Sequence, residues 1–120
     1  MYTIKYYITA RGESPVEVFI DALPQKPKEK VARAAQLLET FGPNLPRPYA
    51  DTVRGKIREL RIQFGRIEIR ILYSFFMKEY ILFSHAFMKK TNEIPEPDIT
   101  LSERRREDFI SRVEKGEIKL

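Results

Sequence analysis

Residues 57–87 read IRELRIQFGRIEIRILYSFFMKEYILFSHAF and contain three strand candidates in succession. Apolar residues alternate with polar ones through the first two candidates, and β-branched and aromatic residues are frequent in all three. The pattern predicts strands at Ile57–Phe64, Arg66–Phe76 and Tyr80–Phe87, with tight turns at Gly65 and at residues 77–79. Strands joined by such short turns pair antiparallel, so an antiparallel sheet is the expected centre of the fold.

The flanking segments add one strand and three helices. Residues 2–9 alternate like a strand, and helices are expected over residues 15–23, 27–41 and 98–115. Residues 43–55 contain three prolines and are expected to form a loop. The order strand, two helices, three strands, helix predicts one α+β domain over the whole chain, 1–120, with the helices packed on one face of the antiparallel sheet.

The composition narrows the class of protein. The 120 residues are 42% hydrophobic, which is enough for one core. Cysteine is absent and His85 is the single histidine, so thiolate sites and sites with several histidines are excluded, and we expect no metal and no cofactor. The sequence has no apolar run that could span a bilayer and no signal-peptide pattern, so we expect a cytoplasmic protein without membrane contact.

The net charge of +5 is concentrated in one third of the chain. Residues 54–90 contain nine lysines and arginines but three acidic residues, whereas the two signs nearly balance in residues 1–53 and 91–120. A concentrated positive region indicates a polyanionic partner, with nucleic acid as the first candidate. The alternative is a solvated charged face that has no partner.

Alternation along the second strand predicts which side chains share a face of the sheet. Ile67, Ile69 and Ile71 are expected to face the core, so the side chains between them face away. The preceding strand alternates in the same way, and the turn between the two strands brings their outward faces together. One exposed surface is then expected to hold Glu59, Arg61, Arg66, Glu68 and Arg70, with Lys89 and Lys90 at its border.

Such a surface fits the cleavage of RNA at a phosphate. Attack by the 2′-hydroxyl requires a base, the transition state gains negative charge, and the leaving 5′-oxygen requires an acid. Arginine forks are suited to holding the phosphate oxygens while that charge grows. Glu59, one of the lysines or His85 could transfer the protons, and the sequence leaves these three possibilities open.

These residues also have a structural interpretation. The two glutamates could form cross-strand ion pairs with Arg61 and Arg70. His85 lies in the most apolar strand, where a hydrogen-bonded core histidine is the alternative to a catalytic one. Tyr73 could belong to the core or stack on a base.

Three segments also match motifs of a known family. Residues 54–61 read RGKIRELR, and residues 85–91 read HAFMKKT with Pro95 beyond them. They resemble the R-G-L-x-E-L-R and H-x-F-x-K-K-T…P segments of the phage-derived, HigB-like branch of the RelE/ParE toxins, and Arg66–Tyr73 resembles the R-x-x-Y strand of that branch. The resemblance covers nearly the whole chain. Lys56 departs from it, because the family usually has an apolar residue there.

The resemblance implies the RelE-like fold and the toxin role of a type II toxin–antitoxin system. The implied activity is a metal-independent, ribosome-dependent endoribonuclease that cleaves mRNA through 2′-hydroxyl attack. The implied partners are the ribosome, mRNA and a cognate antitoxin of the helix-turn-helix type, with no small-molecule cofactor.

The resemblance also implies roles by position. Phosphate binding would fall to Arg61, Arg66, Arg70, Lys89 and Lys90, and proton transfer to Glu59 or His85. Apart from the resemblance, the positive charge and the aromatic ring of this segment lead us to expect further RNA contacts from Arg54, Lys56, Arg58 and Tyr73. On this interpretation Arg61→Ala and Arg70→Ala should each abolish toxicity in a protein that still folds.

Two alternatives use the same fold. One is a ParE-like inhibitor of DNA gyrase without nuclease activity, and the other is an inactive module that only binds nucleic acid or an antitoxin. The fold alone does not separate these functions.

Overall fold

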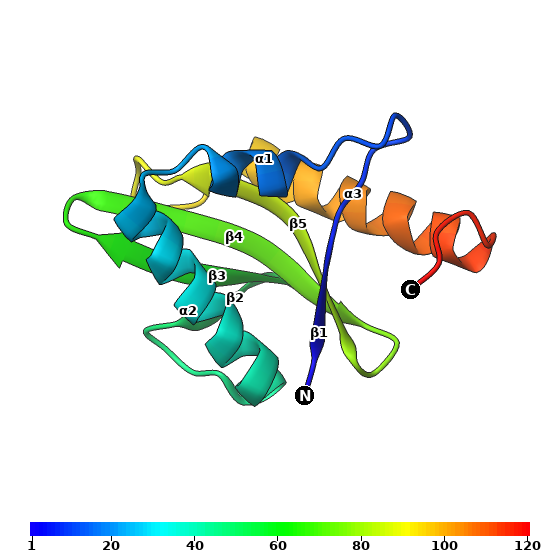
Figure 1. Cartoon of the computed structure of the whole chain (residues 1–120), viewed down its shortest axis with the longest axis horizontal. Helices are drawn as coiled ribbons and strands as arrows, with labels where there is room; N and C mark the ends of the chain where they lie inside the picture. Colours follow the sequence, from blue (N-terminus) through cyan, green and yellow to red (C-terminus); the bar gives the residue numbers. More distant parts are fainter.

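The computed structural model describes residues 1–120 as one five-stranded sheet with three helices (Figure 1). The sheet has the strand order β1-β5-β4-β3-β2. Its strands are β1 (Thr3–Tyr6), β2 (Ala50–Arg54), β3 (Ile57–Phe64), β4 (Ile67–Phe76) and β5 (Tyr80–Met88). The helices are α1 (Pro15–Asp21), α2 (Gln25–Phe41) and α3 (Glu96–Glu114), and a 3-10 turn at Gly42–Asn44 follows α2.

This architecture confirms the predicted α+β class and the order of the predicted elements, with two differences in the sheet. Residues 50–54, expected to be part of a loop, form the edge strand β2, which pairs antiparallel with β3. The sheet is mixed rather than wholly antiparallel, because β1 pairs parallel with β5. The long connection between β1 and β5 allows either direction, so alternation within each strand could not predict it.

The larger core lies between the sheet and the pair α1 and α2. Leu38 of α2 is fully buried against strand residues that include Leu60, Ile71 and Phe83. Ile69 belongs to the same cluster, which confirms the predicted inward direction of the β4 isoleucines. The side chains that alternate with them therefore point to the other face of the sheet.

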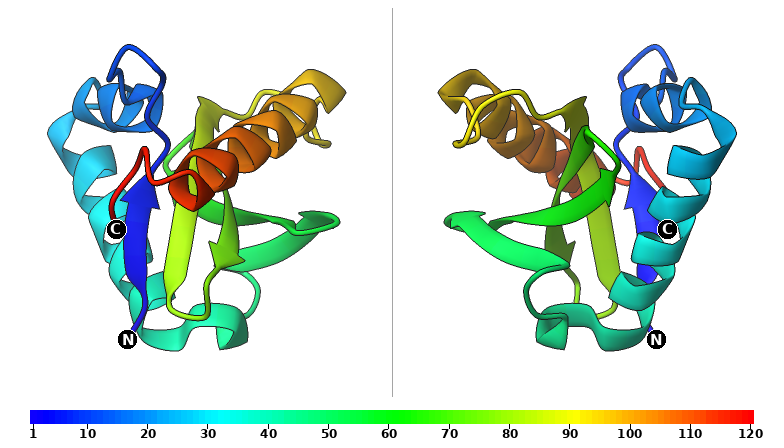
Figure 2. Two further views of the ribbon diagram at one scale, coloured as in Figure 1. Left: turned by 90° about the vertical axis from the view of Figure 1, so that its right-hand side faces the viewer. Right: turned by 90° about the vertical axis from the view of Figure 1, so that its left-hand side faces the viewer.

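Helix α3 covers that other face, so the expectation that all helices share one face was wrong (Figure 2). Phe109 of α3 packs in a second cluster with Tyr7, Phe76 and Leu82. Consecutive residues of a strand point to opposite faces of the sheet, so a run of consecutive residues is buried only if both faces are covered. Ile81 to Ser84 form such a run in β5, and all four are fully buried.

The direction of α3 determines which part of this face of the sheet remains uncovered. Asp98 in the first turn of α3 contacts His85, and Arg106 farther along contacts Ser74. The helix therefore runs from the His85 level toward the β4–β5 turn and leaves the sheet uncovered toward the β3–β4 turn. None of the helices combines the length and apolar character needed to cross a membrane.

Candidate nucleic-acid site on the uncovered sheet face

The strand register places most residues of the predicted exposed surface in three rows across the uncovered part of the sheet, here called the site face. Directly opposite positions on neighbouring strands are about 5 Å apart, so side chains within one row are in reach of each other. The rows are Glu59–Leu72–His85, Arg61–Arg70–Phe87 and Gln63–Glu68–Lys89.

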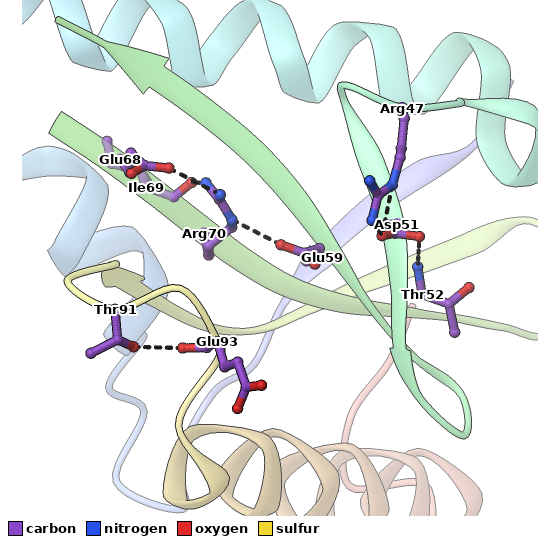
Figure 3. Close-up of polar contacts among 9 residues, drawn as sticks. All are labelled: Arg47, Asp51, Thr52, Glu59, Glu68, Ile69, Arg70, Thr91 and Glu93. Carbon is purple, nitrogen blue, oxygen red and sulfur yellow. Dashed lines mark hydrogen bonds and ion pairs between the residues drawn. The ribbon is translucent and has the colours of Figure 1, made fainter. Parts of the chain in front are cut away.

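Arg70 lies at the centre of the site face and is almost fully buried. Its side chain is 3% exposed, with Nε 2.8 Å from Glu59 Oε1 and Nη2 3.2 Å from Glu68 Oε1 (Figure 3). Nη1 donates a further hydrogen bond to the carbonyl oxygen of Ile69. Arg70 therefore serves two carboxylates and a backbone oxygen of its own chain, and the expected phosphate contact by Arg70 is not supported by this geometry.

One polar atom of this cluster lacks a hydrogen bond. The Nε of Arg70 is buried and, although Glu59 Oε1 is close, its N–H does not point at an acceptor. The contact is thus an ion pair without a directed hydrogen bond, and weaker than a forked pair. It nevertheless holds the Glu59 carboxylate, whose side chain is 13% exposed, in one place at the border of solvent.

A hollow of about 380 Å³ opens beside this carboxylate. Glu59, Arg61 and Lys89 line it together, and Asn92 and Glu93 contribute from the loop that follows β5. Figure 3 shows that loop on one side of the Arg70 cluster and the Arg47–Asp51 pair on the other. The hollow thus places the Glu59 carboxylate beside two cations, Arg61 and Lys89, that could contact a phosphate group.

The cations of the hollow differ from Arg70 in having no acidic partner. Neither Arg61 nor Lys89 belongs to an ion pair of the chain, and Lys90 is exposed and equally unpaired. At the rim, by contrast, the hydrogen bond from Arg47 holds the pKa of Asp51 below its usual value, so Asp51 is an ionised and paired acid. Charge that could attract an anion therefore remains at Arg61 and Lys89.

His85 lies on the same face but is engaged by α3. A bulge in β5 breaks the register with β4 between Leu72 and Tyr73, so Ser84 and His85 both face α3. Ser84 Oγ contacts Ser102 Oγ, and His85 Nε2 lies 2.7 Å from Asp98 Oδ1. The His85 ring also stacks on Phe87. His85 is therefore half-buried and held by an acid at the start of α3, so it has the hydrogen bond of its structural interpretation without a full core position.

Other predicted residues lie away from the hollow. Arg66 is in the β3–β4 turn, four residues and roughly 13 Å along β4 from Arg70. Arg54 forms ion pairs with Glu96 and Glu103 of α3, which raise the pKa of Arg54. Arg54 joins β2 to α3 while its side chain stays exposed to solvent.

The remaining predicted RNA contacts divide into buried and exposed residues. Tyr73 is fully buried in the larger core, so the expectation that it contacts RNA was wrong, and its burial also raises the pKa of its hydroxyl. Arg58 lies beside it, with Nε 3.3 Å from the Tyr73 hydroxyl. Lys56 is exposed at the β2–β3 turn, next to α3 residues such as Arg104.

Sequence reasoning missed the partners that determine these positions. Asp98 orients His85 from thirteen residues away, and Asp51 pairs with Arg47 across a bend of the chain. Only the Arg47–Asp51 pair could be suspected from the sequence, because the two opposite charges are four residues apart. That spacing brings side chains together in a helix but not in general in a loop.

Two comparisons bear on the family of the chain. Comparison with curated proteins gave no match. The model of the family described as phage-derived Gp49-like proteins matches residues 18–107, which include β2 to β5, the hollow and the first part of α3. The chain therefore belongs to the phage-derived Gp49-like family.

Proposed function

We propose that this protein is the toxin of a type II toxin–antitoxin pair and that it cleaves mRNA bound to the ribosome. The observation that carries the proposal is the hollow in which a fixed carboxylate, Glu59, faces two unpaired cations, Arg61 and Lys89. The RelE/ParE resemblance of residues 54–95 and the phage-derived family point to the same class of protein.

The proposed reaction uses these three side chains. The Glu59 carboxylate accepts the proton of the 2′-hydroxyl, and the 2′-oxygen attacks the adjacent phosphorus. The bond from phosphorus to the 5′-oxygen breaks, and the Lys89 ammonium protonates that leaving oxygen. Arg61 stabilises the negative charge on the non-bridging oxygens. The products are a 2′,3′-cyclic phosphate and a 5′-hydroxyl end, and no metal takes part.

Arg70 has a positioning role in this proposal. Its guanidinium holds Glu59 and Glu68 from below the surface, so it determines where the base lies without touching the substrate. The ribosome supplies the mRNA in a defined conformation, and a cognate antitoxin covers the toxin until it is needed. We include the ribosome and the antitoxin as partners because the RelE/ParE resemblance implies them.

The test is induced expression in a bacterial host followed by mapping of mRNA 5′ ends. The wild type should arrest growth and produce cuts inside translated codons, and the Lys89→Ala/Lys90→Ala variant should lose both effects. The matched control is Lys26→Ala/Lys28→Ala, which removes the same charge from the start of α2, outside the hollow. The control should cut like the wild type.

Other outcomes would contradict the proposal in distinct ways. Growth arrest with intact mRNA and altered DNA supercoiling would indicate a gyrase inhibitor. Equal cutting by both double variants would remove Lys89 and Lys90 from the mechanism, and absence of arrest would favour a module that only binds.

A further inference from the structure

A second hollow, of about 410 Å³, lies at the free edge of β3. The ladder between β2 and β3 ends at the pair Ala50–Leu60, and the last backbone contact is the Arg61 N–H donated to the Tyr49 carbonyl oxygen. Beyond that point β3 has no neighbouring strand on this side. We call this second hollow the edge hollow, and its wall includes Lys30, Arg33 and Leu37 of α2, Pro48 and Tyr49, and Arg61, Gln63 and Glu68.

The edge hollow holds cations that have no acidic partner. Lys30, Arg33 and Arg61 are absent from the ion pairs of the chain, although Arg47, Arg54, Arg70 and Arg112 are all paired. The one carboxylate of the wall, Glu68, is already bound to Arg70. Lys30 Nζ donates to the carbonyl oxygen of Gln63, which fixes one positive charge at the strand edge. The result is a concave surface with an excess of positive charge.

An exposed aromatic ring completes the wall. Tyr49 is 44% exposed, whereas Tyr73 of β4 is fully buried. Its main chain is held on both sides, because Tyr49 N donates to Pro46 O and Tyr49 O accepts from Arg61 N. An exposed ring on a held main chain, beside unpaired cations, is an arrangement with which proteins bind single-stranded nucleic acid: the cations follow the phosphates and the ring stacks on a base.

The edge hollow and the hollow of the proposed site share one lining residue. Arg61 lines both hollows, the one with Glu59 and Lys89 and the one with Arg33 and Tyr49. A strand whose phosphate contacts Arg61 at the site would therefore reach the edge hollow with its neighbouring nucleotides.

The geometry points to a binding subsite for single-stranded RNA in the edge hollow, where Lys30 and Arg33 contact phosphates and Tyr49 stacks on an unpaired base. This inference rests on the proposed function, because it places the strand that enters or leaves the proposed cleavage site. Single-stranded RNA is favoured over a duplex, since a stacked base must be free of its pairing partner.

The test measures binding of a 2′-O-methyl RNA strand of about ten nucleotides, a length within the range that such grooves bind. This probe keeps the phosphates and bases but cannot be cut by 2′-hydroxyl attack. Fluorescence anisotropy between about 50 and 200 mM salt gives the affinity and its salt dependence. The variants are Arg33→Gln and Tyr49→Ala, and the matched controls are Lys26→Gln, on the same helix outside the hollow, and Tyr49→Phe.

The two variants should fail in different ways. Arg33→Gln should lower the slope of log affinity against log salt by about 0.7, the value for one phosphate contact with a single strand. Tyr49→Ala should weaken binding about tenfold with the slope unchanged, as expected for the loss of one stacked base. Tyr49→Phe keeps the ring and should bind like the wild type, and Lys26→Gln should keep the wild-type slope.

Several results would overturn the inference. These are unchanged slope and affinity in both variants, no binding of the strand by the wild type, or tighter binding of a duplex of the same sequence. The proposed function is tested separately, by mRNA cleavage in cells. If the wild type cuts mRNA but Arg33→Gln and Tyr49→Ala bind RNA like the wild type, only the subsite is refuted. Binding that depends on these residues in a protein that cuts no mRNA would refute only the nuclease.

Discussion

At the scale of single residues, Arg61 and Arg70 are directly opposite on the site face but have different surroundings. Arg70 is buried against Glu59, whereas Arg61 is half-buried and unpaired. Arg70→Ala would leave the Glu59 carboxylate without its cation, so we expect a loss of about 3 kcal/mol in the free energy of unfolding. Arg61→Ala should change it by no more than about 0.5 kcal/mol. Urea unfolding of the two variants measures both values.

The control for this prediction separates charge from packing. Arg70→Met with Glu59→Gln removes both charges of the pair, so it should be more stable than Arg70→Met alone, in which the half-buried carboxylate has lost its cation. If Arg70→Ala unfolds at the wild-type urea concentration, the pair contributes little and Arg70 is free for another role.

Alternation alone predicted that Glu59, Arg61 and Arg70 share a face, and the register confirms it. The Arg70–Glu59 ion pair was among the cross-strand pairs that the sequence left open, and the structure contains it. The sequence did not predict that Glu68 pairs with Arg70 as well, because the choice between neighbouring arginines depends on side-chain rotamers. Tyr73 follows the alternation, because it is in phase with Ile69 and Ile71 and lies in the same core cluster.

At the scale of elements, α3 is attached to the sheet by few apolar contacts. Phe109 is its one large fully buried side chain, and the remaining contacts include Arg105 to the Ser84 carbonyl oxygen and Arg106 to Ser74 Oγ. Phe109→Ala should therefore cost about 3 kcal/mol. It should speed hydrogen exchange of the α3 amides more than that of the β4 amides, as mass spectrometry of peptic fragments would show.

Phe109→Leu keeps most of the apolar volume and serves as the control, with exchange close to that of the wild type. Equal acceleration across α3 and β4 in Phe109→Ala would mean that the helix and the sheet open as one unit. The polar contacts would then be the stronger attachment of α3.

The elements that sequence patterns missed are those that depend on partners. β2 has five residues and follows a proline-containing segment, so it forms because the edge of β3 offers hydrogen bonds. The side of the sheet that α3 covers likewise depends on burial of both faces of β5. Long periodic segments such as Ile67–Phe76 do not depend on context in this way, and their prediction was correct.

At the scale of the whole molecule, unpaired cations from different segments meet beside β3. Arg61 and Lys89 line the hollow of the site face, and Lys30 and Arg33 join Arg61 in the edge hollow. The excess charge of residues 54–90 is thus only part of the basic surface, because Lys30 and Arg33 come from a segment whose charges balance overall. The topology, which places α2 beside β3, brings them together.

Buried tyrosines should make the stability of the fold depend on pH. Burial raises the pKa of Tyr73, of Tyr6 and of Tyr7, whose hydroxyl also donates to Asp108. A folded-state pKa above the unfolded value of about 10 means that the neutral form is favoured by folding. This contribution is complete below pH 10 or so and is lost as the pH rises toward the folded-state pKa values, so the free energy of unfolding should fall in alkaline solution.

Tyr73→Phe tests this linkage because it removes the most deeply buried of these hydroxyls. The variant loses the hydrogen bond from Arg58, which should cost about 1 kcal/mol at neutral pH. Above a pH of about 10, however, its stability should fall less steeply than that of the wild type, since one group fewer resists ionisation. Urea unfolding at a series of alkaline pH values measures both slopes. Equal slopes would show that Tyr73 ionises in the folded protein as readily as in the unfolded chain, which its complete burial in the larger core argues against.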